Sequence, residues 1–107
     1  MNDVQEIARQ LQQRLDELLN RVARAEDERR TPLSADFDEQ ASDIEAQDAL
    51  AALEEVALVE IRQVKAALQR VRQGRYGICE SCEEEIPPRR LAAVPTAARC
   101  VDCADLP

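Results

Sequence analysis

The chain has 107 residues, a formal net charge of −8 and no histidine, and charged residues make up 34% of it against 2% aromatic residues. This length leaves room for one small unit or two subdomains, and it excludes a large core. No apolar run approaches the roughly 18 residues of a membrane span, and no apolar leader with a cleavage site opens the chain, so we expect a soluble cytoplasmic protein without a membrane partner. We expect no enzyme, because the chain lacks a glycine-rich phosphate loop and a nucleophile-plus-base arrangement.

The first predicted element is a helix over about residues 3–27. Asp3 followed by Glu6 is typical of a capping box at its start. Its apolar residues recur at steps of three and four and so lie on one helical stripe; they are Val4, Ile7, Leu11, Leu15, Leu18, Val22 and Ala25.

A second helix is predicted over about residues 37–73, after a break at Thr31-Pro32-Leu33-Ser34. Its stripe again steps by three and four, and it consists of Ala46, Leu50, Leu53, Ala57, Ile61, Val64, Leu68 and Val71, widened by Ile44, Val56, Leu58 and Val59. Two such stripes joined by a short tip, about residues 28–36, predict a long antiparallel helical hairpin, a coiled coil over residues 1–73. A bundle built from two chains is the competing account, which leaves a monomer or a weak dimer.

The charged residues from Thr31 through the first half of the second predicted helix are all negative. Between Thr31 and Glu60 there is no Lys or Arg, whereas nine carboxylates lie there: Asp36, Asp38, Glu39, Asp43, Glu45, Asp48, Glu54, Glu55 and Glu60. Such a surface argues against direct nucleic-acid binding, which depends on Lys and Arg at phosphates. It suits a partner with a basic groove, although a merely solvated helical face explains any single carboxylate as well.

Four cysteines close the chain as two pairs, Cys79 with Cys82 and Cys100 with Cys103. Two residues between paired cysteines let one turn aim both sulfurs at a single ion, and the interval between the pairs fits a structural zinc site. Disulfide or redox chemistry is the alternative. Catalytic zinc fits poorly, because four thiolates leave no open position.

The last predicted element is a zinc-finger module over residues 74–107. Its apolar residues are too few to close a core without metal; they are Tyr76, Ile78, Ile86, Leu91 and Val94. The expected fold is therefore all-α, a long helical hairpin followed by a small four-cysteine zinc finger.

Residues 74–82, with the sequence GRYGICESC, together with Ile86, Arg90-Leu91, Ala93, Pro95 and Cys100-Val101-Asp102-Cys103, resemble the zinc-finger signature of the DksA/TraR family. The acidic hairpin upstream is similar as well. The resemblance implies a regulator that binds bacterial RNA polymerase without contacting DNA. It implies that an acidic hairpin tip enters the secondary channel and acts near the catalytic centre.

The resemblance places the family's tip pattern on Asp36, Asp38, Glu39 and Ala41, with Glu39 where the family has a second Asp. A capping box formed by Asp36 and Glu39 is the competing explanation.

Two departures concern the finger. Glu83 follows the second cysteine where the family usually has Gly, so it must tolerate a left-handed turn. Of the basic positions that bind the alarmone ppGpp in the family, Arg90 alone matches, so we expect weak or no ppGpp dependence.

A zinc-stabilised adaptor or dimerisation module, and a thiol-based redox regulator, remain the alternative functions.

Overall fold

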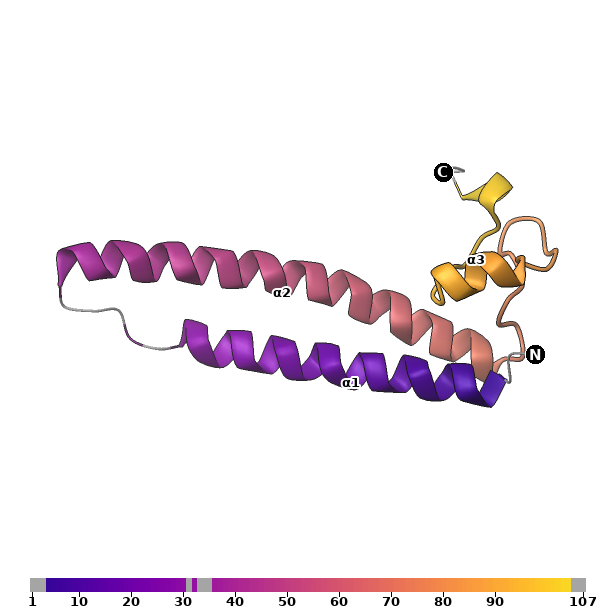
Figure 1. Ribbon diagram of the computed structural model, residues 1–107, viewed down its shortest axis with the longest axis horizontal. Coiled ribbons are helices and arrows are strands. Elements are labelled where there is room, and N and C mark those ends of the chain that lie inside the picture. The colour runs from indigo at the N-terminus through magenta and orange to yellow at the C-terminus, as the bar shows by residue number, and fades with distance from the viewer. Residues whose placement is uncertain (1–3, 31, 33–35, 105–107) are drawn as a thin grey trace. The chain divides into compact units, whose positions relative to one another are not determined.

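The computed structural model describes residues 4–30, 32 and 36–104, apart from the side chains of residues 37 and 38. Its elements are α1 (Val4–Arg29), α2 (Phe37–Arg72), α3 (Pro88–Ala93) and a 3₁₀ turn, η1 (Val101–Cys103). Within the described residues no strand forms, and one isolated bridge pairs Ile78 with Glu85. Two long helices followed by a small cysteine-rich module confirm the predicted fold class (Figure 1).

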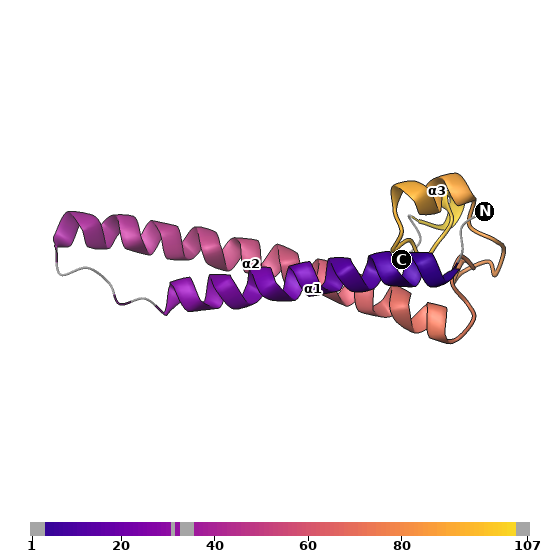
Figure 2. The ribbon, with the colours of Figure 1, turned by 60° about the horizontal axis from the view of Figure 1, so that its bottom comes forward.

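The chain divides into two compact units, one of residues 16–62 and the other of residues 1–15 with 63–107. In the first unit, the second half of α1 runs antiparallel to the first part of α2 (Figure 2). Leu18, Ala25, Ala57 and Ile61 are buried there. These positions belong to the predicted stripes, so the 3.6-residue period correctly identified the seam between the helices.

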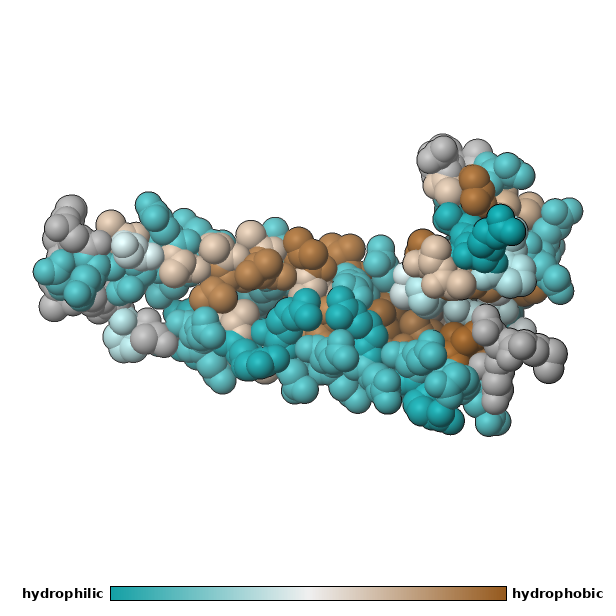
Figure 3. All heavy atoms as spheres, viewed as in Figure 1, coloured by the Kyte–Doolittle hydropathy of each residue, from teal (hydrophilic) through white to brown (hydrophobic). Residues whose placement is uncertain are grey.

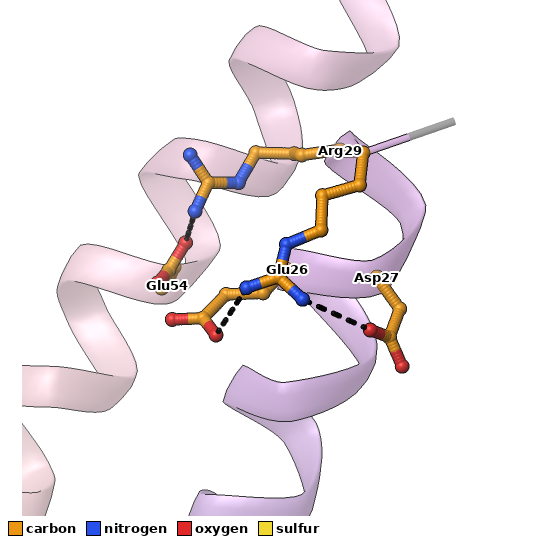
Figure 4. A network of polar contacts seen from close by, with 5 residues as sticks. Glu26, Asp27, Arg29 and Glu54 are labelled. Carbon is orange, nitrogen blue, oxygen red and sulfur yellow. Dashed lines mark hydrogen bonds and ion pairs between the residues drawn. The ribbon is translucent and has the colours of Figure 1, made fainter. Parts of the chain in front are cut away.

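An ion pair crosses this unit between the Arg29 guanidinium and the Glu54 carboxylate (Figure 4). The Glu54 side chain is only 11% exposed, whereas that of Arg29 is 36% exposed. The Nε of Arg29 is buried and has no hydrogen-bond partner among the described residues. Because Glu54 lies largely away from water, the guanidinium is the group that compensates its charge.

Several apolar residues predicted for the seam of α2 instead lie at the surface. Leu53 is 61% exposed and Val56 is 68% exposed. The other exposed members of the predicted set are Ala46, Ile44, Leu58 and Val59. The prediction was wrong for Ala46 and Leu53, which were assigned to the stripe, because α2 carries apolar residues on more sides than one neighbouring helix can cover. The residues that widened the stripe are the ones that the two-chain alternative also accommodates.

In the second unit, residues 4–15 of α1 accompany residues 63–72 of α2. Leu11, Leu15, Val64 and Leu68 are buried, as the stripes predicted. Ala67 is also fully buried, although it was not assigned to the stripe. Val4, predicted for the seam, is 46% exposed because it is the first residue of α1.

The C-terminal end of α2 is a Schellman motif, which stops the helix and turns the chain toward the cysteines. The N–H of Arg75 donates to the carbonyl of Arg70 at 2.8 Å, and the N–H of Gly74 donates to that of Val71 at 3.1 Å. Gly74 has φ +71°, a left-handed conformation that glycine adopts without the penalty a Cβ imposes.

In the described part of the chain, no helix has both the length and the apolarity that crossing a membrane requires.

Candidate metal centre and helix tip

The two cysteine pairs converge in the second unit. The sulfur atoms of Cys79, Cys82, Cys100 and Cys103 all lie within 4.8 Å of one another. The Cys82 and Cys100 sulfurs are 3.8 Å apart, which is about the edge of a tetrahedron with Zn–S bonds of about 2.3 Å. All four are free thiols, too far apart for the roughly 2.05 Å bond of a disulfide. The donor set therefore fits zinc.

The first cysteine turn is shaped by hydrogen bonds of the main chain. The N–H of Cys79 donates to the carbonyl of Glu84 at 2.9 Å, and the N–H of Glu83 donates back to the carbonyl of Cys79 at 3.0 Å. Closing this loop forces Glu83 to φ +61°, the one positive φ of a non-glycine residue in the described chain. The expectation that Glu83 must tolerate a left-handed turn is confirmed.

Gly77 precedes this turn and supplies a backbone conformation that the turn requires. Its φ is +82°, and a Cβ there would lie 3.4 Å from Cδ1 of Leu91. Its carbonyl accepts the N–H of Ile86 at 2.7 Å. Glycine at this position therefore satisfies both a left-handed backbone and a close approach of α3.

The second cysteine turn is held by α3 and by η1. The N–H of Cys103 donates to the carbonyl of Cys100 at 3.1 Å. Pro88 begins α3, where its missing N–H costs nothing. The Nε of Arg90 then donates to the carbonyl of Arg99 at 2.8 Å, next to Cys100. Arg90 thus contributes to the structure of the finger, a role that sequence reasoning did not assign to it.

The apolar core of the module is small. Cys79, Ile86 and Cys103 form it, with Leu91 and Cys100 packed against it. Of the remaining apolar residues predicted for this module, Tyr76 and Ile78 are half-buried and Val94 is 41% exposed. Two of the core's three buried members are cysteines, so the core depends on the state of its sulfurs.

The thiols differ in acidity because their hydrogen-bond partners differ. Hydrogen bonding from the main chain at Cys82 lowers the pKa of the Cys79 thiol to about 6, against the opposing effect of burial. The hydrogen bond with the Cys100 sulfur, together with burial, raises the pKa of Cys103 to about 12. A cluster that ionises readily at one thiol and resists further ionisation is one that a divalent cation stabilises, because the ion compensates the added thiolate charges.

Two side chains join the end of α2 to the finger. Arg70 donates to the carbonyl of Thr96 at 3.1 Å and lies 3.9 Å from the Glu80 carboxylate. The hydroxyl of Tyr76 donates to the carbonyl of Pro95 at 2.8 Å. Burial raises the pKa of this tyrosine, and Arg70 partly opposes that effect. These bonds fix the segment before Cys100 relative to the last turn of α2.

The acidic residues at the start of α2 belong to the other unit. The Asp36 carboxylate accepts the N–H of Glu39 at 3.1 Å, so Asp36 is the N-cap of α2. Asp36, Glu39 and Ala41 are exposed. The side chain of Asp38, a further predicted tip residue, lies outside the described residues, as does Asp3. The capping explanation therefore holds for Asp36, and it leaves the carboxylate at the surface.

Paired helices carrying a four-cysteine zinc finger define the class of protein. Residues 8–71 match the family described as "DnaK suppressor protein-like, N-terminal domain", and residues 74–106 match "Prokaryotic dksA/traR C4-type zinc finger". The chain belongs to the DksA/TraR family. Zinc is the metal that this family's finger and the four clustered cysteines indicate.

Named relatives agree with this assignment. An uncharacterized protein of Aquifex aeolicus is 43% identical over 53 residues, which are 50% of this chain and 37% of that protein. The RNA polymerase-binding transcription factor DksA of Escherichia coli K12 is 46% identical over 46 residues, 43% of this chain and 30% of that protein. The matches thus span about a third of the curated relatives' length.

A solved structure extends the similarity to the fold. Transcription factor DksA2 from Pseudomonas aeruginosa superposes with a TM-score of 0.71 at 28% sequence identity. The match covers 94% of this chain and 75% of that one. The likeness therefore includes the paired helices as well as the finger.

Proposed function

We propose that the chain is a transcription regulator that binds bacterial RNA polymerase, with the acidic start of α2 entering the secondary channel and acting near the catalytic centre. Membership of the DksA/TraR family carries this proposal, since relatives are named as RNA polymerase-binding factors. The absence of Lys and Arg between Thr31 and Glu60 supports it, because an acidic surface is attracted to a basic channel and repelled by DNA.

Zinc has a structural role in this proposal, with Cys79, Cys82, Cys100 and Cys103 as its ligands. Four sulfurs complete a tetrahedral shell and leave no position for water or substrate. When bound, the metal supplies folding free energy to a module whose apolar core is small. Arg70, Tyr76 and Arg90 hold the surrounding loops through main-chain carbonyls.

The tip is tested by removing its charge while keeping its structure. The variant Asp36→Asn with Glu39→Gln deletes two carboxylates, and asparagine is as good an N-cap as aspartate. A matched control, Glu45→Gln with Asp48→Asn, deletes two exposed carboxylates further along α2. We expect the tip variant to lose its effect on transcription in vitro, while the control retains it and both keep the helicity of the parent chain.

Equal transcription effects from the tip variant and the parent chain, both binding polymerase, would refute the tip mechanism. Failure of the zinc-loaded parent chain to bind core polymerase would refute the proposal as a whole. A DNA-binding measurement in the same buffers should give no affinity, because the acidic helices repel phosphates.

We further infer that ppGpp has little effect on this protein. Arg90, the one matching basic position, is half-buried and its Nε is bonded to the Arg99 carbonyl. Strong synergy between ppGpp and the chain in a transcription assay would contradict this inference. We also infer a cytoplasmic location, because the proposed partner acts there.

A further inference from the structure

The middle of α2 has an apolar face that its own neighbouring helix leaves uncovered. Leu53 and Val56 are 61% and 68% exposed, and Val59 is 46% exposed. At 100° per residue, Val56 and Val59 lie between Leu53 on one side and Glu55 on the other. Figure 3 shows brown and tan spheres exposed along the middle of α2 on the face that it displays. Contiguous exposed apolar surface of this kind is typical of a protein interface.

The face continues into a groove between α1 and α2 within the unit of residues 16–62. The groove has a volume of about 210 Å³, and its apolar lining includes Val22, Ala25, Leu50, Leu53 and Ala57. Its charged lining consists of Arg21, Arg24 and Glu28 of α1 and Glu54 of α2. Leu53 therefore joins the groove to the exposed face. Together they make one apolar strip, with Arg21, Arg24 and Glu28 along the edge on α1 and Glu55 along the edge on α2.

Each edge of the strip carries a carboxylate and an arginine seven residues apart, and charges of opposite sign lie at the same level on the two edges. The edge on α1 carries Glu17 and, seven residues on, Arg24. The edge on α2 carries Glu55 and, seven residues on, Arg62. Because the two helices are antiparallel and the groove brings Ala25 beside Glu54 and Ala57, Arg24 is level with Glu55, and two turns away Glu17 is level with Arg62.

The arginines of the two edges and Glu55 make few polar contacts with the residues that the structure describes. Arg21, Glu55 and Arg62 are exposed and form no ion pair with any residue that the structure describes. Arg24 bonds through Nε to the main-chain oxygen of Asn20 at 3.4 Å, a weak contact on its own helix. These residues can therefore pair with charges from outside the chain at little cost.

We propose that a second copy of this chain covers the strip. A copy rotated by 180° about an axis parallel to the helices lays apolar strip on apolar strip, with Glu55 of each copy against Arg24 of the other. Such a two-fold interface repeats each contact twice, and it buries the surface that two isolated helices leave in water.

Sedimentation of the zinc-loaded full chain, from micromolar to millimolar protein, tests the proposal. We expect a reversible dimer that weakens with added salt, because the edge pairs are solvent-accessible. Val56→Glu should raise the dissociation constant by about tenfold or more, since it places an unpaired carboxylate in the apolar strip. Ile44→Glu is the control, because Ile44 is 45% exposed on the same helix but more than three turns away from Val56.

A charge exchange separates a second copy from any other partner. Glu55→Arg and Arg24→Glu should each weaken the dimer several-fold, and the double variant should restore it, because each swapped charge again meets its opposite. Helicity and zinc content identify variants that fold. A chain that stays monomeric up to millimolar concentration overturns the proposal, as does a dimer indifferent to Val56→Glu or a double variant no tighter than the singles. None of these measurements involves polymerase, so the outcome is independent of the proposed function.

Discussion

Replacing Glu83 by glycine should stabilise the zinc finger. Glu83 sits at φ +61° directly after Cys82, with its N–H bonded to the carbonyl of Cys79. A side chain in this left-handed conformation costs about 1–2 kcal/mol because Cβ approaches the following carbonyl oxygen. Glycine avoids that penalty. However, glycine is more flexible in the unfolded chain, and this entropy offsets about 0.5–1 kcal/mol of the gain. The expected net gain is about 0.5–1 kcal/mol.

The measurement is zinc affinity by chelator competition, because folding of this module is coupled to the metal. A gain of about 0.5–1 kcal/mol corresponds to roughly two- to fivefold tighter zinc binding. Glu83→Ala removes the same carboxylate and keeps the Cβ, so it separates the backbone effect from any effect of charge. Glu84→Gly, at a neighbouring position without positive φ, should weaken binding through added chain entropy.

The reasoning would be refuted if Glu83→Gly and Glu83→Ala bound zinc equally well. That result would attribute the effect to the carboxylate beside a thiolate cluster, and not to the backbone. A loss of affinity in Glu83→Gly relative to Glu83→Ala would show that unfolded-state entropy exceeds the strain.

Three further predictions concern stability. Gly74→Ala should lower the free energy of unfolding by about 1 kcal/mol, because Gly74 has φ +71° with open space around it, leaving strain as the sole penalty; no change in the urea midpoint would contradict this. Glu54→Gln should cost about 1–2 kcal/mol by removing the carboxylate paired with Arg29, and the loss should shrink in an Arg29→Ala background if the pair is responsible. Removing zinc with a chelator should abolish the fixed environment of Tyr76, seen by its fluorescence, while far-ultraviolet circular dichroism keeps most of its helical signal.

The cysteine spacing by itself determined the metal centre. Two CxxC pairs predict clustered sulfurs because tight turns impose short-range geometry, and the four sulfurs do cluster within 4.8 Å. The family resemblance anticipated the left-handed residue at Glu83, and the local pattern of Asp36 and Glu39 anticipated the cap at Asp36. Each of these features depends on residues a few positions apart, so a linear sequence contains enough information to predict it.

The tertiary structure decided which apolar residues are buried and what Arg90 contacts. Periodicity located the apolar residues of α2 but assigned Leu53 to the seam, because a helix with several apolar sides gives no local sign of which side packs. Arg90 matches a basic position of the family in sequence, but only the fold shows that its Nε bonds to the Arg99 carbonyl, which reaches it through the return of the chain after α3. Such contacts depend on how the chain folds back on itself, and a repeat or a spacing in the sequence does not encode that.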